Sequence, residues 1–255
     1  MDLCLKDNIA IISGTNISDL KETPELLSEI KKINQNAWPQ FLLNWECKGW
    51  SELFTTLSDY QIVLTRDETL IAYGYTIPIF WERELIDIPD DLAILVENGV
   101  STYHKGIKPN ILLALAAVVS PKHKGEGLSY EIVKAMKSLS KQRKIDTLIV
   151  PVRPTLKSKY PLIPIEKYSR WKTDDGKTFD PWLRVHDKLG GVIFKTAEKS
   201  MIIKGSVNEW EEWSNIKMLD SGSYVIEGAL SPVKINVEND MGIYYDPCIW
   251  VKYEN

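Results

Sequence analysis

Long hydrophobic runs and clusters of basic residues are both missing from this sequence. The longest apolar run, 111–119, is far shorter than the roughly 20 residues that a membrane-spanning helix needs. Charges near the first methionine interrupt the apolar segment that a secretory signal requires. The net charge is -4 and no basic stripe is present, which argues against nucleic-acid binding. These absences predict a cytoplasmic protein that neither enters a membrane nor binds nucleic acid.

Cysteine and histidine are also scarce, with three of each in the chain. They are Cys4, Cys47, Cys248, His104, His123 and His186. The cysteines are odd in number and far apart, which does not suit a disulfide framework. Neither residue type shows the paired spacing of zinc ligands. We therefore expect reduced, structural cysteines and no bound metal.

Apolar residues, in contrast, are plentiful. The 255 residues are 44% hydrophobic and 10% aromatic, which excludes a disordered or fibrous chain and is sufficient for one large core. No tandem repeat, low-complexity tract or Gly/Ser linker marks a boundary. We therefore interpret 1–255 as a single domain.

The first part of the chain predicts helices followed by a hairpin. A short strand is expected at 8–12, and Thr23 followed by a proline is typical of a helix start. The segment 38–57 is rich in Trp, Phe and Leu and predicts one or two further helices, broken near Gly49. β-branched and aromatic residues on both sides of the turn 66–68 indicate two antiparallel strands.

The middle of the chain predicts a strand, a turn, a helix and a second strand. Segment 111–120 is apolar on both faces, as expected for a central strand covered by helices on each side. The apolar residues of 129–142 lie on one helical face, and 147–152 is again a buried strand. Together these segments form a βαβ unit, whose crossover we expect to be right-handed.

The remainder of the chain is less regular. The Pro-rich, charged segment 153–181 predicts a long loop of the kind that carries function or covers a site. Further expectations are a helix at 182–189, a strand at 192–204, a helix at 208–213 and alternating segments at 224–237 and 243–253.

The turn between the central strand and its helix carries the strongest functional signal. It reads Lys124-Gly125-Glu126-Gly127-Leu128-Ser129. The first amides of a helix have no intrahelical acceptor and lie at the positive end of the helix dipole, so they bind a diphosphate through backbone N–H groups. Gly125 and Gly127 permit left-handed backbone and close approach of a ligand. We expect a phosphate cradle here.

Two other phosphate-binding turns do not fit this sequence. The pattern G-x-x-x-x-G-K-[ST] of the P-loop does not occur. The dinucleotide-binding fingerprint is incomplete, because no third glycine opens the helix.

The turn is similar to the acyl-CoA-binding turn of the GNAT (N-acetyltransferase) superfamily. That turn has Arg or Gln, two residues, Gly, one residue, and then Gly or Ala. Lys124, Gly127 and Ser129 fall on these positions, with Lys in place of Arg or Gln and Ser in place of the last small residue. The segment 185–191 resembles the short helix of the family that ends in a Lys-Leu-Gly-Phe-like sequence, and this places His186 on the usual general-acid position.

The resemblance implies a fold of the α/β (α+β) class, with a mixed, mostly antiparallel central sheet flanked by helices. It covers about 60–205, which we take as the core. An inserted loop at 153–181 and a C-terminal extension at 206–255 exceed the minimal fold. Segments 151–154 and 180–186 are also similar to an uncharacterised bacterial group of GNAT-like acyltransferases.

The resemblance also implies how the co-substrate is bound. Acetyl-CoA or another acyl-CoA is expected, without a metal. The expected binding residues are Val118, Val119, Lys124, Gly125, Glu126, Gly127, Leu128 and Ser129. The two valines would lie along the pantetheine arm, where a backbone N–H near Val118 faces the thioester carbonyl, while their side chains belong to the core.

Catalytic candidates follow from the same resemblance. His186 is expected to protonate the departing thiolate, since a thiol pKa of about 8.5 and an imidazolium pKa of about 6.5 allow efficient transfer. The alternative is a helix-end histidine bonded to a backbone carbonyl. The central strand contains no acid, so Glu166 and Asp180 of the inserted loop are the candidates for a general base. An amine that arrives neutral needs none.

Arg153, Trp171 and Trp182 are the candidates for binding the acceptor. Arg153 belongs to a group of basic and tyrosine side chains around the inserted loop, which would hold an acidic acceptor; the alternative is a solvated, charged loop. Trp171 and Trp182 flank the end of that loop and would form pocket walls. We expect most of the nine tryptophans to be core residues, because each buries a large area.

The leading hypothesis is an acyl-CoA-dependent N-acyltransferase, in which the amine of a small molecule attacks the thioester directly. The missing acid in the central strand keeps open a non-catalytic acyl-CoA-binding module. A structural or partner-binding domain is the third reading. A homodimer formed through the C-terminal segments is compatible with the sequence.

Overall fold

The structure, a computed structural model, describes residues 9–13, 24–67 and 69–254. The predictions that concern Cys4, Asn8, Thr23 and Glu68 lie outside these ranges. In the part of the chain that is described, no helix is long and apolar enough to cross a membrane.

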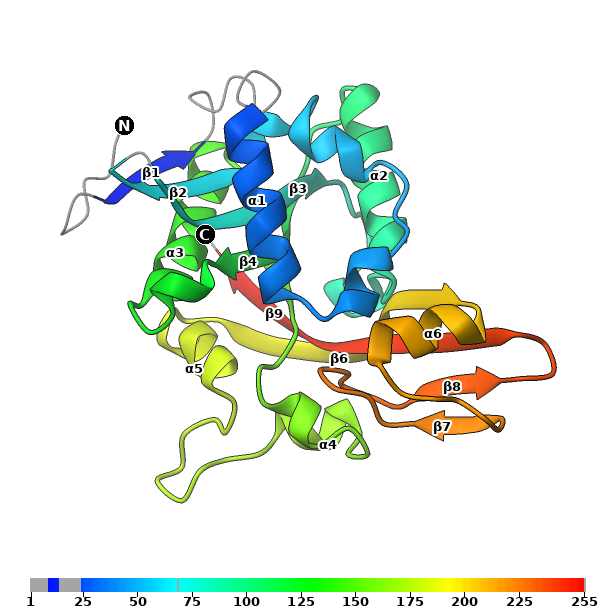
Figure 1. The fold of residues 1–255 in the computed structure, drawn as a ribbon. Helices are drawn as coiled ribbons and strands as arrows, with labels where there is room; N and C mark the ends of the chain where they lie inside the picture. Colours follow the sequence, from blue (N-terminus) through cyan, green and yellow to red (C-terminus); the bar gives the residue numbers. More distant parts are fainter. Residues whose placement is uncertain (1–8, 14–23, 68, 255) are drawn as a thin grey trace.

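Nine strands in the described ranges form one sheet (Figure 1). They are β1 (Ile9–Ser13), β2 (Ile62–Arg66), β3 (Thr69–Ile79), β4 (Ile111–Val119), β5 (Thr147–Val152), β6 (Val192–Gly205), β7 (Gly222–Tyr224), β8 (Val233–Asn236) and β9 (Met241–Glu254). The strand order is β1-β2-β3-β4-β5-β9-β8-β7, and β6 pairs with the other edge of β9. Only β4 and β5 pair in parallel among these strands. The mixed, mostly antiparallel sheet predicted from the sequence is confirmed.

Helices cover both faces of this sheet (Figure 1). They are α1 (Pro24–Ala37), α2 (Leu92–His104), α3 (Leu128–Gln142), α4 (Ile165–Ser169), α5 (Pro181–Lys188) and α6 (Val207–Ser214). One core cluster joins the sheet to α3, α4 and α5, and two others join the opposite face to α1 and α2. The smaller α6 packs over β6, β8 and β9.

A bulge in β4 changes which side chains meet which helices. Before it, Leu112 packs in the cluster with α3 and Leu113 packs in the cluster with α2. At Leu115, β4 has one residue more than β3, so this residue has no partner in the register. An extra residue reverses the alternation of the side chains that follow. Val118 therefore packs in the cluster with α1, on the same face as Leu113.

The parallel strands β4 and β5 separate before either of them ends. Their pairing stops at Leu113 with Ile149, whereas β4 continues to Val119 and β5 to Val152. The part of β4 beyond Leu113 therefore has no hydrogen-bonded partner in β5. Backbone groups on that edge require water or a ligand as their partner.

The last strand of the chain is built into the sheet between β5 and β6. Residues 249–254 of β9 pair with β5, and residues 242–252 pair with β6. Trp250 and Val251 are buried in the clusters on opposite faces of the sheet. The segment after residue 205, which the sequence suggests is an extension, thus supplies part of the main core.

Most predicted elements of the middle of the chain are confirmed, and two segments differ. Segment 38–57 contains no α-helix, because Pro39 lacks an N–H group and Gly49 takes a left-handed conformation with φ 84°. In and just after it, the chain forms three 3₁₀ helices, at Gln40–Asn44, Trp50–Phe54 and Ser58–Tyr60. The predicted loop 153–181 also contains regular structure, since α4 and a 3₁₀ helix at Lys157–Lys159 lie within it.

Candidate functional site

A cavity of about 930 Å3 runs along the separated edge of β4. The glycine turn before α3 lines one end, and residues 114–119 of β4 line the middle. Residues of β5, β6 and β9 line the other end, together with tryptophans of the segment that follows α1 and Tyr75 of β3. One continuous space therefore joins the predicted phosphate cradle to a second, chemically different end.

The glycine turn presents backbone N–H groups to the first end of the cavity. Gly125 has φ 88° and Gly127 has φ 78°, and a Cβ atom at either position would meet nothing within 4 Å. No side chain caps α3. The N–H groups from Gly125 to Ser129 have no hydrogen-bond partner among the described residues. An open helix N-terminus of this kind suits the binding of an anion, as the sequence predicts for this turn.

Glu126 does not line the cavity, but its side chain stabilises the turn. Besides the two glycines, the predicted turn residues Lys124, Leu128 and Ser129 do line the cavity. Glu126 accepts a hydrogen bond from Nη2 of Arg66 at 2.8 Å, and its carboxylate lies 3.0 Å from Nδ1 of His123. These hydrogen bonds hold the pKa of Glu126 below its ordinary value. Its backbone N–H remains part of the cradle.

The middle of the cavity is a strand edge. Val118 and Val119, which the resemblance places beside the pantetheine arm, both line it, and the side chain of Val118 packs under α1 with 3% exposed. The N–H of Ser120 donates to the carbonyl oxygen of Ile71, so in this register the backbone groups of Val118 face β3 and those of Val119 face the open edge. An unpaired strand edge offers alternating N–H and C=O groups to an extended ligand that contains amides.

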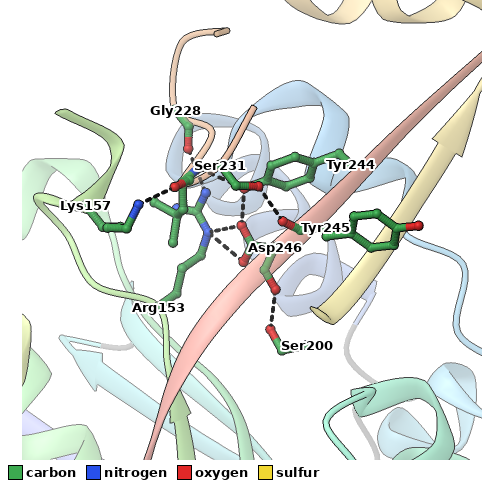
Figure 2. Close-up of polar contacts among 9 residues, drawn as sticks. Arg153, Lys157, Ser200, Gly228, Ser231, Tyr244, Tyr245 and Asp246 are labelled. Carbon is green, nitrogen blue, oxygen red and sulfur yellow. Dashed lines mark hydrogen bonds and ion pairs between the residues drawn. The ribbon is translucent and has the colours of Figure 1, made fainter. Parts of the chain in front are cut away.

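At the second end of the cavity, Arg153 forms an ion pair with Asp246 (Figure 2). Nε of Arg153 lies 3.1 Å from Oδ1 and 3.0 Å from Oδ2 of Asp246, and Nη2 donates to the carbonyl oxygen of Gly228 at 2.6 Å. The side chain of Arg153 is 18% exposed and that of Asp246 is 1% exposed. Arg153 is therefore anchored by a buried carboxylate and still reaches the cavity.

Further hydrogen bonds hold Asp246 in place (Figure 2). The hydroxyl of Tyr244 donates to Oδ1 of Asp246 and accepts from the N–H of Leu230 at 2.8 Å. Ser200 donates to the backbone carbonyl of Asp246 at 2.8 Å. Burial raises the pKa of the Tyr244 hydroxyl, so this group stays protonated and remains a donor. The carboxylate that orients Arg153 is thus fixed from several sides.

Four aromatic residues form what we call the aromatic wall of the cavity. They are Trp38, Trp45, Trp50 and Tyr75. The ring centroids of Trp45 and Trp50 are 5.6 Å apart, and those of Trp50 and Tyr75 are 5.9 Å apart, both in edge-to-face arrangements. Aromatic faces attract cations with apolar stems. Trp182, a predicted pocket residue, also lines the cavity from α5.

His186 lies behind the cavity lining. Its neighbours Trp182 and Val185 line the cavity, whereas His186 does not and is 1% exposed. Nδ1 lies 2.6 Å from the hydroxyl of Tyr253, and Nε2 is buried without a hydrogen-bond partner in the described part of the chain. Burial lowers the pKa of His186 to about 3, so the ring is neutral at neutral pH. This position favours a structural role, and the role of general acid remains a prediction.

Three further predicted site residues lie away from the cavity. Glu166 is exposed on α4 and pairs with Arg170. Trp171 packs against aromatic side chains of its own loop. Asp180 is buried and caps α5 through the N–H groups of the first turn. The structure therefore brings Arg153 and Trp182 together with the glycine turn, but not these three.

Sequence reasoning missed Asp246 and the aromatic wall. Asp246 lies in a segment that the sequence predicts only as alternating, and no motif marks it. The concentration of aromatic residues in 38–57 was the available signal for the wall. Composition does not separate a tryptophan that walls a cavity from one that fills a core, because both bury a large area.

The described residues show no metal site: no group of three or more His, Cys, Asp or Glu side chains is arranged to hold an ion. The cavity instead combines an anion site, an open strand edge, an anchored arginine and an aromatic wall. This arrangement suits an extended, phosphate-bearing molecule whose far end meets a second, smaller molecule.

Comparison with known proteins identifies the class. No family model matches the sequence. A curated relative, the arginine N-acetyltransferase avaD of Aspergillus versicolor, is 32% identical over 258 residues, which cover 89% of this chain and 88% of the relative. The loading GNATL domain of CurA from Lyngbya majuscula has a TM-score of 0.60 at 15% identity, covering 90% of this chain and 93% of that one. An agmatine N-acetyltransferase has a TM-score of 0.51 at 10% identity, covering 97% of this chain and all of that one.

The structural likenesses show the fold, which is that of the GNAT class. With a curated relative that is 32% identical over most of its length, the chain belongs to the GNAT superfamily of N-acetyltransferases. It is an acetyltransferase, an enzyme that transfers an acyl group from an acyl-CoA to an amine. The relative is fungal, so the bacterial grouping suggested by 151–154 and 180–186 stays a prediction.

Proposed function

We propose that this enzyme transfers the acetyl group of acetyl-CoA to an amine nitrogen of arginine or of a closely similar guanidino compound. The observation that carries the proposal is the continuity of the cavity from the glycine turn to the aromatic wall. The turn suits a diphosphate, and the aromatic wall suits a delocalised cation on an apolar stem. The curated relative, named as an arginine N-acetyltransferase, supports the same acceptor.

The chemistry needs little from side chains. The amine nitrogen attacks the thioester carbon and forms a C–N bond, the C–S bond breaks, the nitrogen loses a proton and the thiolate gains one. Backbone N–H groups from Gly125 to Ser129 would hold the diphosphate. The free edge of β4 would align the pantetheine arm, and one of its N–H groups would stabilise the negative charge that develops on the thioester oxygen.

An amine must lose its proton before it attacks. In the described chain, Asp246 is the one acidic residue that lines the cavity, and its carboxylate is engaged by Arg153 and Tyr244. The predicted bases Glu166 and Asp180 do not line it. We therefore propose that the acceptor binds as the neutral amine, which predicts an activity that rises with pH up to the pKa of the acceptor amine.

Release of free thiol tests the proposal. Purified enzyme with acetyl-CoA and L-arginine is expected to release coenzyme A and to add one acetyl group to arginine, detected by mass spectrometry. Calorimetry with acetyl-CoA alone measures the binding step separately. Binding without thiol release across a panel of amines would instead support the non-catalytic acyl-CoA-binding module. Absence of acetyl-CoA binding would reject both readings.

A further inference from the structure

We propose that Arg153 binds the carboxylate of an α-amino acid acceptor and so makes the enzyme select arginine over agmatine, the same guanidino amine without the carboxylate. This inference rests on the proposed function and adds to it the group that the acceptor must carry. The structure offers three separate observations in its favour: the unbonded donors of Arg153, its fixed orientation, and the chemistry of the aromatic wall.

The guanidinium of Arg153 is only partly used within the protein. Nε binds Asp246 and Nη2 binds the carbonyl oxygen of Gly228. Nη1 has no hydrogen-bond partner among the described residues, and the side chain lines the cavity with 18% of its surface exposed. A guanidinium offers five N–H donors in a rigid fork. Donors therefore remain available for a carboxylate in the cavity.

Arg153 is also held in one orientation before any ligand arrives (Figure 2). Its anchor, Asp246, is fixed by Tyr244 and Ser200. Binding to a side chain that is already ordered avoids the entropic cost of immobilising a flexible arginine.

Lys157 is a second buried cation near Arg153 and Asp246. Lys157 is 1% exposed and donates to the carbonyl oxygens of Leu230 and Tyr160 at 2.5 and 2.9 Å. Burial lowers the pKa of Lys157 to about 8, so it still carries a proton at neutral pH. Lys157 interacts electrostatically with Glu198 and Asp246, and Asp246 also pairs with Arg153, so the two cations are matched by two carboxylates.

The aromatic wall of the same cavity suits the other end of the acceptor. Trp45, Trp50 and Tyr75 of the aromatic wall line the same cavity. No described acidic residue other than the engaged Asp246 lines it, so aromatic faces are the groups left to receive a guanidinium. The acceptor would thus lie with its carboxylate toward Arg153 and its guanidinium toward the aromatic wall.

A substrate series tests this inference with the unaltered enzyme. We would compare kcat/KM at saturating acetyl-CoA for L-arginine, L-argininamide and agmatine. A charge-assisted contact predicts that arginine exceeds both other amines by about 10- to 100-fold. Equal values for the three substrates, or a preference for agmatine, would overturn the proposal.

Failure of the proposed function can be separated from failure of this inference. If none of the three amines is acetylated although acetyl-CoA binds, the proposed acceptor reaction is rejected. Calorimetry of arginine and agmatine with the coenzyme A complex then decides about Arg153. Tighter binding of arginine supports the carboxylate contact, and equal or absent binding of both contradicts it.

A variant of Arg153 tests whether this residue causes the preference for arginine over agmatine. Arg153→Lys keeps a positive charge beside Asp246 but loses the planar fork, so we expect a higher KM for arginine and an unchanged KM for agmatine and for acetyl-CoA. Lys159→Arg, an exchange between the same two cationic side chains at an exposed position of the same loop, is the matched control. A purely structural Arg153 would change the kinetics of arginine and agmatine in parallel. If the variant does not fold, the substrate series alone decides.

Discussion

Nε of Arg153 lies 3.0 Å from one carboxylate oxygen of Asp246 and 3.1 Å from the other, and the two residues are 93 positions apart in the chain. The contact joins the end of β5 to β9, the strand that the C-terminal segment inserts between β5 and β6. Because the carboxylate is buried and the guanidinium borders the cavity, the same pair contributes to the fold and to the site.

The first prediction concerns this pair. Asp246→Asn leaves the Arg153 charge without its partner in a buried place, so the free energy of unfolding is expected to fall by about 3–5 kcal/mol. Urea denaturation followed by circular dichroism measures the loss. Asp175→Asn, which removes an exposed partner of Lys177, is the control and is expected to leave the midpoint unchanged. Equal midpoints for both variants would contradict a structural role of the pair.

The second prediction concerns the glycine turn. Gly127→Asp places a negative charge where the diphosphate would bind, so the Kd for acetyl-CoA is expected to rise more than about tenfold. Asp is among the residues that tolerate a positive φ, which limits the effect on folding. Gly106→Asp is the matched control, because Gly106 has φ 66° and equally open surroundings but does not line the cavity. Similar loss of binding in both variants would point to strain and not to a phosphate site.

The third prediction separates the backbone of the turn from its side chains. Glu126→Gln removes the charge that faces Arg66 and His123 but leaves every backbone N–H group in place. The pairing is at the surface, so we expect the Kd for acetyl-CoA to stay within about threefold of the unaltered value. Isothermal titration at moderate salt provides the measurement. A loss as large as that of Gly127→Asp would show that the carboxylate, and not the amide, is needed.

The fourth prediction uses the pH dependence of stability. The pKa of His186 is about 3 in the folded chain against an ordinary value of 6.5, so at pH 5 the unfolded chain binds the proton and the folded chain does not. Stability therefore falls as the pH drops below 6.5. Between pH 7 and pH 5 this one group is expected to cost about 2 kcal/mol. His186→Gln should lose about that much less over the same interval, as measured by urea denaturation at both pH values.

The same variant also tests the role that the sequence suggests for His186. A general acid contributes about 100-fold or more to the rate, whereas a buried structural residue does not act on the thiolate. Since His186 does not line the cavity, we expect His186→Gln to keep most of its kcat at pH 8. A fall of two orders of magnitude with unchanged binding of acetyl-CoA would restore the catalytic role.

Local sequence signals made much of the fold predictable, and in the site they made the glycine turn and the strand before it predictable. The apolar run of β4, the amphipathic α3 and the turn between them are encoded within about thirty consecutive residues, where periodicity and glycine placement act over short distances. The aromatic wall and Asp246 were not predictable in this way, whereas Arg153 and Trp182 were predicted as acceptor-binding residues. The wall and Arg153 come from segments before and after β4 in the sequence, and Asp246 comes from a strand near the end of the chain.

The sequence by itself determined the open start of α3, because unpaired amides at a helix start depend only on the glycines and on the helix that follows them. Only the tertiary structure decided which side chains line the same cavity as those amides. Insertion of β9 between β5 and β6 brings Asp246 to Arg153, and the burial of His186 against Tyr253 follows from the same strand. Such contacts depend on the register of strands far apart in the chain, which no local pattern specifies.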